Sequence, residues 1–137
     1  MGEQRLWLGI SVALYVAALP LPALRNHGWN DFGPDGAPFT GLDCFVQGLF
    51  GVIGVVPFLP WIANVGLWVL WNAEFKRHSV PSSFAWGLPI YAVSALALLC
   101  LMLQFKPGIG SFFWVGSLLS GALAVPKRSV ANALPAP

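Results

Sequence analysis

The sequence predicts an all-α integral membrane protein with four transmembrane helices in a single domain, residues 1–137. Hydrophobic residues make up 57% of the chain and charged residues 9%, against about 25% in an ordinary soluble domain. The mean hydropathy is +0.72. Because each helical crossing takes roughly 20 residues plus a connection, a chain of this length has room for about four spans.

The apolar runs place the four spans at about residues 6–24, 57–75, 84–103 and 109–125. The first run follows Arg5, and a secretory signal peptide is the competing interpretation. Pro20 and Pro22 leave no clean small-x-small cleavage site, so a retained helix is preferred. Residues 25–42 are rich in turn-forming Gly, Pro, Asn and Asp and are expected to form an outer loop. The proline-rich end, 129–137, is expected to be a mobile tail.

The longest apolar stretch, residues 42–75, is too long for one plain crossing. A continuous helix would measure about 50 Å, whereas the hydrocarbon core of a bilayer is roughly 30 Å thick. Pro57 and Pro60 favour a helix start, because a proline in the first turn removes only amide hydrogens that lack helical partners. Residues 43–56 then form an extra apolar segment that is re-entrant, interfacial or buried in the bundle. The alternative is one tilted helix, strongly kinked at the two prolines.

The positions of Lys and Arg predict the orientation, because positively charged loops stay on the cytoplasmic side during insertion. With four crossings, five of the seven basic residues fall on one side and two on the other. The five are Arg5, Lys76, Arg77, Lys127 and Arg128, and the two are Arg25 and Lys106. We therefore expect a multi-pass protein of the bacterial inner membrane with both termini cytoplasmic.

Small residues mark the candidate helix-packing faces, because they let helix backbones approach closely in a membrane. These residues are Gly48, Gly51 and Gly54 in the extra segment, and Gly116 and Ser120 in the last span. We expect the extra segment to pack against the last span. The functional interpretation of this face is contact with a partner protein or an ion path, and packing within the chain is the simpler one.

Three polar side chains, Asp43, Gln47 and Asn64, are the candidate ligand-binding or interaction residues. Asn64 lies inside a predicted span, where an unpaired amide is costly. It either lines a polar site or bonds to a neighbouring helix, an interaction worth roughly 0.6 to 2 kcal/mol. Gln47 and Asp43 lie nearer the predicted outer boundary, where their side chains can reach water.

The two cysteines, Cys44 and Cys100, both fall toward the outer face in this topology. An oxidising compartment would permit a disulfide between them, and free buried thiols are the other interpretation. His27, Asp31, Asp35 and Asp43 lie in or at the end of the polar loop, without the spacing of a calcium site. We therefore expect solvated turn residues there and no metal site.

Several function classes are disfavoured by what the sequence lacks. No carboxylate lies in the middle of a predicted span, which argues against a small proton-coupled exporter. His27 and His78 lie in predicted loops, where they cannot ligate haem between helices. There is no CxxC pair for disulfide exchange and no cluster of Lys and Arg for nucleic acid. We expect no catalytic residues, no cofactor and no nucleic-acid partner.

Three blocks of the sequence, GLDCFVQGLFG, PWIANVGLW and GIGSFFWVGSLL, give the chain its resemblance to a known group. With a Gly-x-Asp start, a Trp-x-Ala-Asn core and an aromatic Trp-x-x-Ser final helix, the chain resembles small uncharacterised four-helix bacterial membrane proteins. The resemblance implies an inner-membrane location and brings no activity or site residue with it.

The function expected from these observations is protein–protein interaction within the bilayer. The chain would be an accessory subunit, a scaffold or an immunity-type protector, in contact with membrane lipids and with a membrane-protein partner or a second copy of itself. The alternative is a small oligomeric channel or transporter whose polar path uses Asn64, Gln47 and Asp43.

Overall fold

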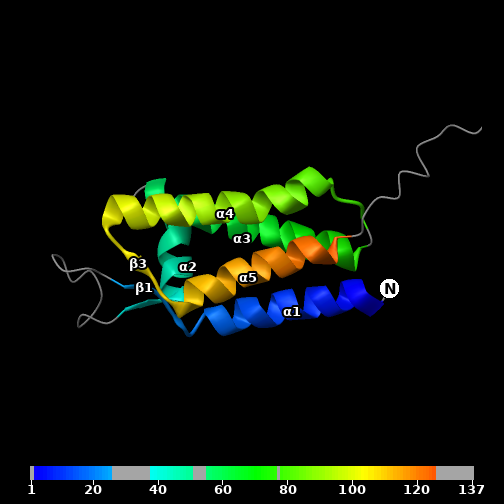
Figure 1. Cartoon of the computed structure of the whole chain (residues 1–137), viewed down its shortest axis with the longest axis horizontal. Coiled ribbons are helices and arrows are strands. Elements are labelled where there is room, and N and C mark those ends of the chain that lie inside the picture. Colours follow the sequence, from blue (N-terminus) through cyan, green and yellow to red (C-terminus); the bar gives the residue numbers. More distant parts are fainter. Residues whose placement is uncertain (1, 26–37, 51–54, 77, 126–137) are drawn as a thin grey trace, which may run out of the picture.

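The computed structural model describes residues 2–25, 38–50, 55–76 and 78–125 of the chain (Figure 1). Within these ranges it contains five helices and three short strands. In chain order they are α1 (Gly2–Ala18), β1 (Pro22–Arg25), β2 (Phe39–Thr40), α2 (Gly41–Phe50), α3 (Val55–Phe75), α4 (Ser82–Leu103), β3 (Lys106–Pro107) and α5 (Ile109–Ala124). The molecule is therefore mostly helical.

Four of the helices, α1, α3, α4 and α5, run along the long axis of the molecule (Figure 1). The most extensive contact is between α1 and α5, and α4 packs against both α3 and α5. The short helix α2 lies across the others, near the end that carries the strands, and packs against α3. This crossing direction places α2 over the ends of several helices at once.

The prediction of four transmembrane helices is wrong. Among the described residues, α4 alone is long and apolar enough to cross a membrane. Helices α1 and α5 have 17 and 16 residues, which correspond to about 26 Å and 24 Å against a hydrocarbon core of roughly 30 Å. Helix α3 has 21 residues and is not among the candidate crossings. The structure thus supports one candidate crossing and does not support a multi-pass location.

The ends of the predicted spans also differ from those of the helices. The first span was expected to continue to residue 24, but α1 ends at Ala18 and the chain enters strand β1 at Pro22. In the long stretch 42–75, α2 ends at Phe50 and α3 begins at Val55, so the stretch contains two separate helices. The expected mobile tail, 129–137, lies outside the described residues.

A small antiparallel sheet, in the order β2-β1-β3, closes one end of the helical bundle (Figure 1). Leu24 of β1 is opposite Phe39 on one side and Pro107 on the other. Two glycines allow the close approach of the backbones. A side chain at Gly41 would meet the carbonyl of Ala18, and one at Gly108 would meet the carbonyl of Pro22.

Two apolar clusters form the core. The larger one draws on α1, α3, α4 and α5 and consists of Tyr15, Ala63, Leu67, Leu70, Ala85, Leu88, Ala92, Leu118 and Ala122. The smaller one lies near the sheet, where Leu24 and Phe39 meet Leu99 of α4. Both cysteines pack against this second cluster. It therefore joins the sheet to the last turns of α4.

The packing predicted between the extra segment and the last helix is not found at the described glycines, Gly48 and Gly116. A side chain at Gly48 of α2 would meet Trp61 of α3, and one at Gly116 of α5 would approach Leu14 of α1. Ser120 of α5 is buried and bonds to the Gly116 carbonyl within its own helix. Gly48 and Gly116 therefore each receive a different neighbour from the one expected. Gly51 and Gly54 lie outside the described residues.

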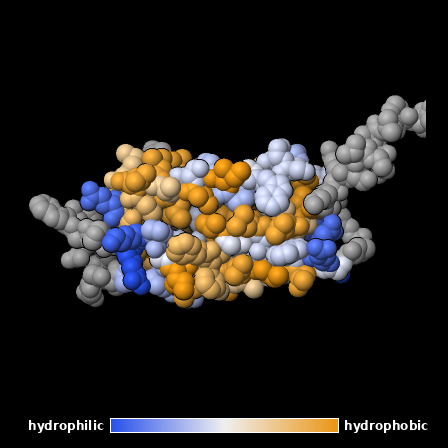
Figure 2. All heavy atoms as spheres, in the orientation of Figure 1, coloured by the Kyte–Doolittle hydropathy of each residue, from blue (hydrophilic) through white to orange (hydrophobic). Residues whose placement is uncertain are grey.

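The surface of the bundle is divided by polarity along the long axis. On the face in Figure 2, hydrophobic residues dominate the middle and hydrophilic residues gather at the two ends. The α4 side chains Ile90, Leu101 and Met102 are 68%, 79% and 62% exposed. A large part of the apolar surface is thus directed outward rather than into the core.

Candidate functional site

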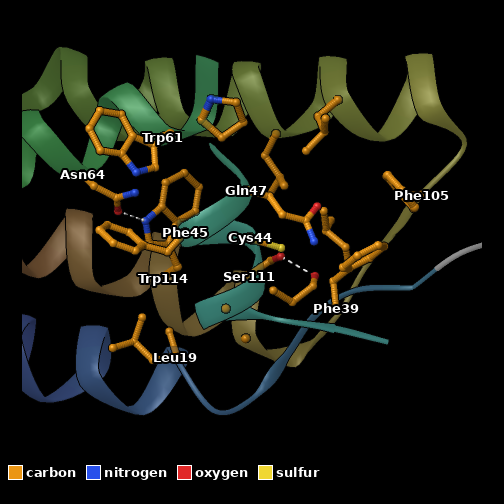
Figure 3. Close-up of a pocket in the computed structure, with 18 of the residues that line it drawn as sticks. Leu19, Phe39, Cys44, Phe45, Gln47, Trp61, Asn64, Phe105, Ser111 and Trp114 are labelled. Carbon is orange, nitrogen blue, oxygen red and sulfur yellow. Dashed lines mark hydrogen bonds between the residues drawn. The ribbon is translucent and has the colours of Figure 1, made fainter. Parts of the chain in front are cut away.

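The candidate site is a pocket of about 110 Å³ at the end of the bundle near the sheet (Figure 3). Its wall draws on all five helices and on strands β1 and β2, because α2 crosses the bundle there. An engineered apolar cavity of about 150 Å³ is large enough to bind benzene. The pocket is smaller than that cavity, so its enclosed space suits a small group.

Aromatic rings form much of the pocket wall. Phe45 of α2 lies 6.1 Å from Trp61 of α3, measured between ring centroids. Phe39 and Phe105 meet edge to face at 5.9 Å on the side of the sheet. Pockets for small molecules are commonly lined by apolar and aromatic side chains with a few polar groups among them. The rings thus provide an apolar cavity between fixed surfaces.

Asn64 supplies one polar group of the pocket. Its side chain is 6% exposed, and its Oδ1 accepts a hydrogen bond of 2.8 Å from Nε1 of Trp114 (Figure 3). The bond joins α3 to α5 and satisfies both atoms that take part in it. It engages only the oxygen of the amide, so the amide nitrogen of Asn64 is left as a donor at the pocket wall.

Trp61 supplies a second donor. Its Nε1 atom is buried and has no hydrogen-bond partner among the described residues. Leaving a buried donor unpaired costs about 1 to 3 kcal/mol, so such atoms are rare in folded proteins. Trp61 and Asn64 are three residues apart on α3 and share one face of that helix. Both side chains therefore lie on the same wall of the pocket, although the Trp61 Nε1 atom itself is covered.

Gln47 lines the pocket with Asn64, whereas Asp43 has another role. Gln47 is half-buried and lies between the two groups of aromatic rings in Figure 3. The exposed Asp43 carboxylate accepts hydrogen bonds from the backbone nitrogen of Thr40, at 2.9 Å, and from its hydroxyl, at 2.7 Å. The Thr40 hydroxyl in turn accepts a bond from the Asp43 nitrogen. This reciprocal capping box starts α2.

The structure thus brings together two of the three residues singled out in the sequence. Trp61 and Trp114 were not among the residues singled out in the sequence, because the N–H of an indole is a small polar part of a large apolar ring. The reasoning from sequence also missed Ser111, whose hydroxyl donates a 2.6 Å hydrogen bond to the Ala23 carbonyl and ties α5 to β1 beside the pocket. The capping box was visible in the sequence as Thr40-x-x-Asp43.

A second group of buried polar atoms lies further along the bundle. Trp71 Nε1 donates to the Ser11 hydroxyl at 2.9 Å, and that hydroxyl donates to the Ser117 carbonyl at 2.7 Å. The Ser117 hydroxyl donates to the carbonyl of Trp114 at 2.6 Å. These bonds hold α1, α3 and α5 together. Every donor in this chain of bonds has an acceptor, so its role is structural.

The two cysteines are free thiols in the structure. Cys44 lines the pocket, and burial, together with the negative charge of neighbouring Asp43, raises the pKa of its thiol to about 12. A nucleophilic cysteine needs a lowered pKa, because the thiolate is the reactive form. Cys44 is therefore protonated at neutral pH and suited to packing rather than to nucleophilic attack.

No group of three or more His, Cys, Asp or Glu side chains gathers as a metal site among the described residues. His27, Asp31 and Asp35 lie outside the described residues. The pocket itself is lined by neutral side chains, with amide, indole and hydroxyl groups as its polar atoms. Its arrangement suits binding of a neutral molecule.

Comparisons with family models, curated proteins and solved structures found no match to this chain. The resemblance to small four-helix bacterial membrane proteins therefore stays a prediction.

Proposed function

We propose that the protein is embedded in the bacterial inner membrane and acts there by binding another protein, without catalytic chemistry of its own. Its role would be that of an accessory subunit, a scaffold or an immunity-type protector. The observation that carries the proposal is α4, which is long and apolar enough to cross a membrane while only 28% of its most apolar stretch is buried. The core helix of a soluble protein would be mostly buried.

The outward face of α4 is the proposed contact surface. Ile90, Val93 and Leu101 are exposed at helical spacing on one side of α4, and no charged residue interrupts the helix. A helix of 22 residues is about 33 Å long and matches a hydrocarbon core of roughly 30 Å. In a bilayer this face would meet lipid chains or the helix of a partner, either another protein or a second copy of this chain.

The orientation of α4 follows from the charges beside its ends. Lys76 and Arg77 precede it, whereas Lys106 follows it. The greater positive charge at its start favours a cytoplasmic position for that end. A reporter that is active in one compartment only, fused after Val80 or after Gln104, should report opposite compartments. The same compartment at both points would contradict a crossing by α4.

A photo-crosslinking amino acid tests the interaction in native membranes. Placed at Ile90 or Leu101, it should give a discrete protein adduct, either with a partner or with a second copy of the chain. Val16 on α1 is 58% exposed and serves as the matched control on a different helix. Lipid adducts alone at all three positions would contradict a protein partner on α4.

The geometry gives less support to the channel alternative. A polar path through Asn64, Gln47 and Asp43 needs all three side chains to face one passage. Asp43 instead caps α2, and the pocket wall is mainly aromatic and aliphatic. We therefore favour the interaction role over transport.

A further inference from the structure

We propose that Arg25 and Lys106 together bind the headgroup of a phospholipid with a net negative charge, at the end of the bundle that carries the sheet. The phosphate of the headgroup contacts both cations, and the acyl chains lie along the apolar last turn of α4. This inference rests on the proposed membrane location and adds a ligand that the protein partner does not require.

The register of the strands brings the two cations together. Arg25, the last residue of β1, is directly opposite Lys106 of β3. Side chains that are directly opposite in an antiparallel pair share a face of the sheet, with Cβ atoms about 4.5 to 5.5 Å apart. Leu24, the neighbour of Arg25, is 7% exposed and packs in the smaller core cluster. Because successive side chains in a strand point to opposite faces, Arg25 and Lys106 both point outward, and both are exposed.

The two positive charges have no acidic partner among the described residues. Neither side chain forms an ion pair or a hydrogen bond with another residue of the described part of the chain. Glu3 and Glu74 lie near the start of α1 and the end of α3, at the opposite end of the bundle (Figure 1). The exposed Asp43 carboxylate accepts its hydrogen bonds from Thr40.

This arrangement favours a bound anion. Like charges that are directly opposite in a pair of strands destabilise the pairing, and an anion in contact with both cations removes that repulsion. An Arg guanidinium forms two parallel hydrogen bonds with phosphate oxygens, and a Lys ammonium adds a compact positive charge. In a phosphocholine headgroup, the choline would bring a third positive charge beside the pair. The pair therefore favours a headgroup whose only charge is its phosphate.

Helix α4 indicates that the phosphate belongs to a lipid. The helix ends at Leu103 and β3 begins at Lys106, so a crossing by α4 places the two cations at the level of the headgroups. Leu101 and Met102, in the last turn of α4, are 79% and 62% exposed. Hydrophilic residues at this end of the molecule border the apolar middle (Figure 2). A free phosphate would leave these apolar side chains uncovered, whereas the acyl chains of a lipid cover them.

The experiment compares two phospholipids with identical acyl chains, phosphatidylglycerol and phosphatidylcholine. The purified full chain in detergent is mixed with equal amounts of both, and native mass spectrometry counts the bound lipids. Each Lys or Arg near a membrane surface strengthens binding of anionic lipid about fivefold, so phosphatidylglycerol should bind about 25-fold more tightly. Inorganic phosphate in large excess should not displace it. Displacement by inorganic phosphate would show a site for a free anion and overturn the proposal.

Single substitutions test whether the pair is responsible. Arg25→Gln and Lys106→Gln should each lower the preference about fivefold, and the double variant should abolish it. Arg25→Lys keeps the charge and should lose less than Arg25→Gln. Lys76→Gln is the matched control, because Lys76 is an exposed cation just after α3, at the other end of the bundle, and it should keep the full preference. Because both Gln substitutions in the pair remove like-charge repulsion, these variants should melt no lower than the native protein in phosphatidylcholine.

The proposal is overturned if the native protein binds both lipids equally, or if the preference persists in the double variant. It is also overturned if Lys76→Gln lowers the preference as much as Arg25→Gln does, because net charge would then explain the binding. The crossing by α4 is read separately, from the compartment reporters. Reporters in opposite compartments together with equal lipid binding would refute this site alone, whereas reporters in the same compartment would refute the membrane crossing on which it rests.

Discussion

The hydrogen bond between Trp114 and Asn64 gives the sharpest stability prediction. Asn64→Leu removes the acceptor and leaves the Trp114 N–H without a partner, which should lower the free energy of unfolding by about 1 to 3 kcal/mol. At about 3 to 5 °C per kcal/mol for a domain of this size, the melting temperature should fall by several degrees. Circular dichroism during heating of the purified protein in detergent measures this change.

A double-mutant cycle separates the bond from the change in side-chain shape. Trp114→Phe should also destabilise, and the double variant Asn64→Leu/Trp114→Phe should lose less than the sum of the two, with a coupling of about 1 kcal/mol. Asn72→Leu is the control, since Asn72 is exposed on the same helix, and it should shift stability by no more than about 0.5 kcal/mol. Strictly additive losses would refute the assignment of this bond as a stabilising link between α3 and α5.

Three further predictions follow from the packing and from the Cys44 thiol. Ser11→Ala breaks the bonds that Trp71 Nε1 and the α5 backbone make with this hydroxyl, and should cost about 1 to 3 kcal/mol in thermal unfolding. Gly48→Ala should lower the free energy of unfolding by about 1 to 3 kcal/mol, because the added methyl group meets the Trp61 indole. Gly87→Ala places its methyl group in open space and should leave the stability unchanged or raise it. Equal effects of the two substitutions would contradict the packing. Because the Cys44 pKa is raised from 9.0 to about 12, its thiolate population below pH 9 should be about a thousandfold lower than that of an ordinary thiol. Alkylation of Cys44 by iodoacetamide should therefore be slow at pH 8, faster as the pH rises toward 12, and fast after denaturation. Rapid reaction of Cys44 in the folded protein at pH 8 would contradict its burial.

The helical nature of the chain was predictable from its apolar runs, but the lengths of the helices were not. Hydropathy shows how apolar a segment is and does not show where its helix ends. The run 6–24 continues in composition through Pro20 and Pro22, yet α1 ends at Ala18. Proline lacks a backbone N–H and disfavours helical geometry in the preceding residue, so the two prolines mark the boundary. Counting apolar residues without this boundary made the first predicted span six residues longer than α1 at its C-terminal end.

The sheet and the pocket were harder to predict, because both depend on contacts between distant segments. The strands have between two and four residues, too few for an alternating pattern to be read. Asn64 and Gln47 were found because amides are conspicuous in apolar segments. The partner of Asn64 could not be named, since Trp114 lies 50 residues further along the chain and on another helix.

The two groups of buried polar atoms differ in how fully their hydrogen-bond donors are satisfied. Around Ser11, the Trp71 and Ser117 side chains and the backbone of α5 form a chain of bonds in which every donor finds an acceptor. Near the sheet, the Trp114 indole is satisfied by Asn64, but the Trp61 indole has no partner among the described residues. The same fold, with the same kind of side chain, thus satisfies two indoles and leaves a third unpaired beside a cavity. Leaving that donor unpaired costs about 1 to 3 kcal/mol, so among the described residues the polar atoms of the bundle are less well satisfied beside Trp61 than around Ser11.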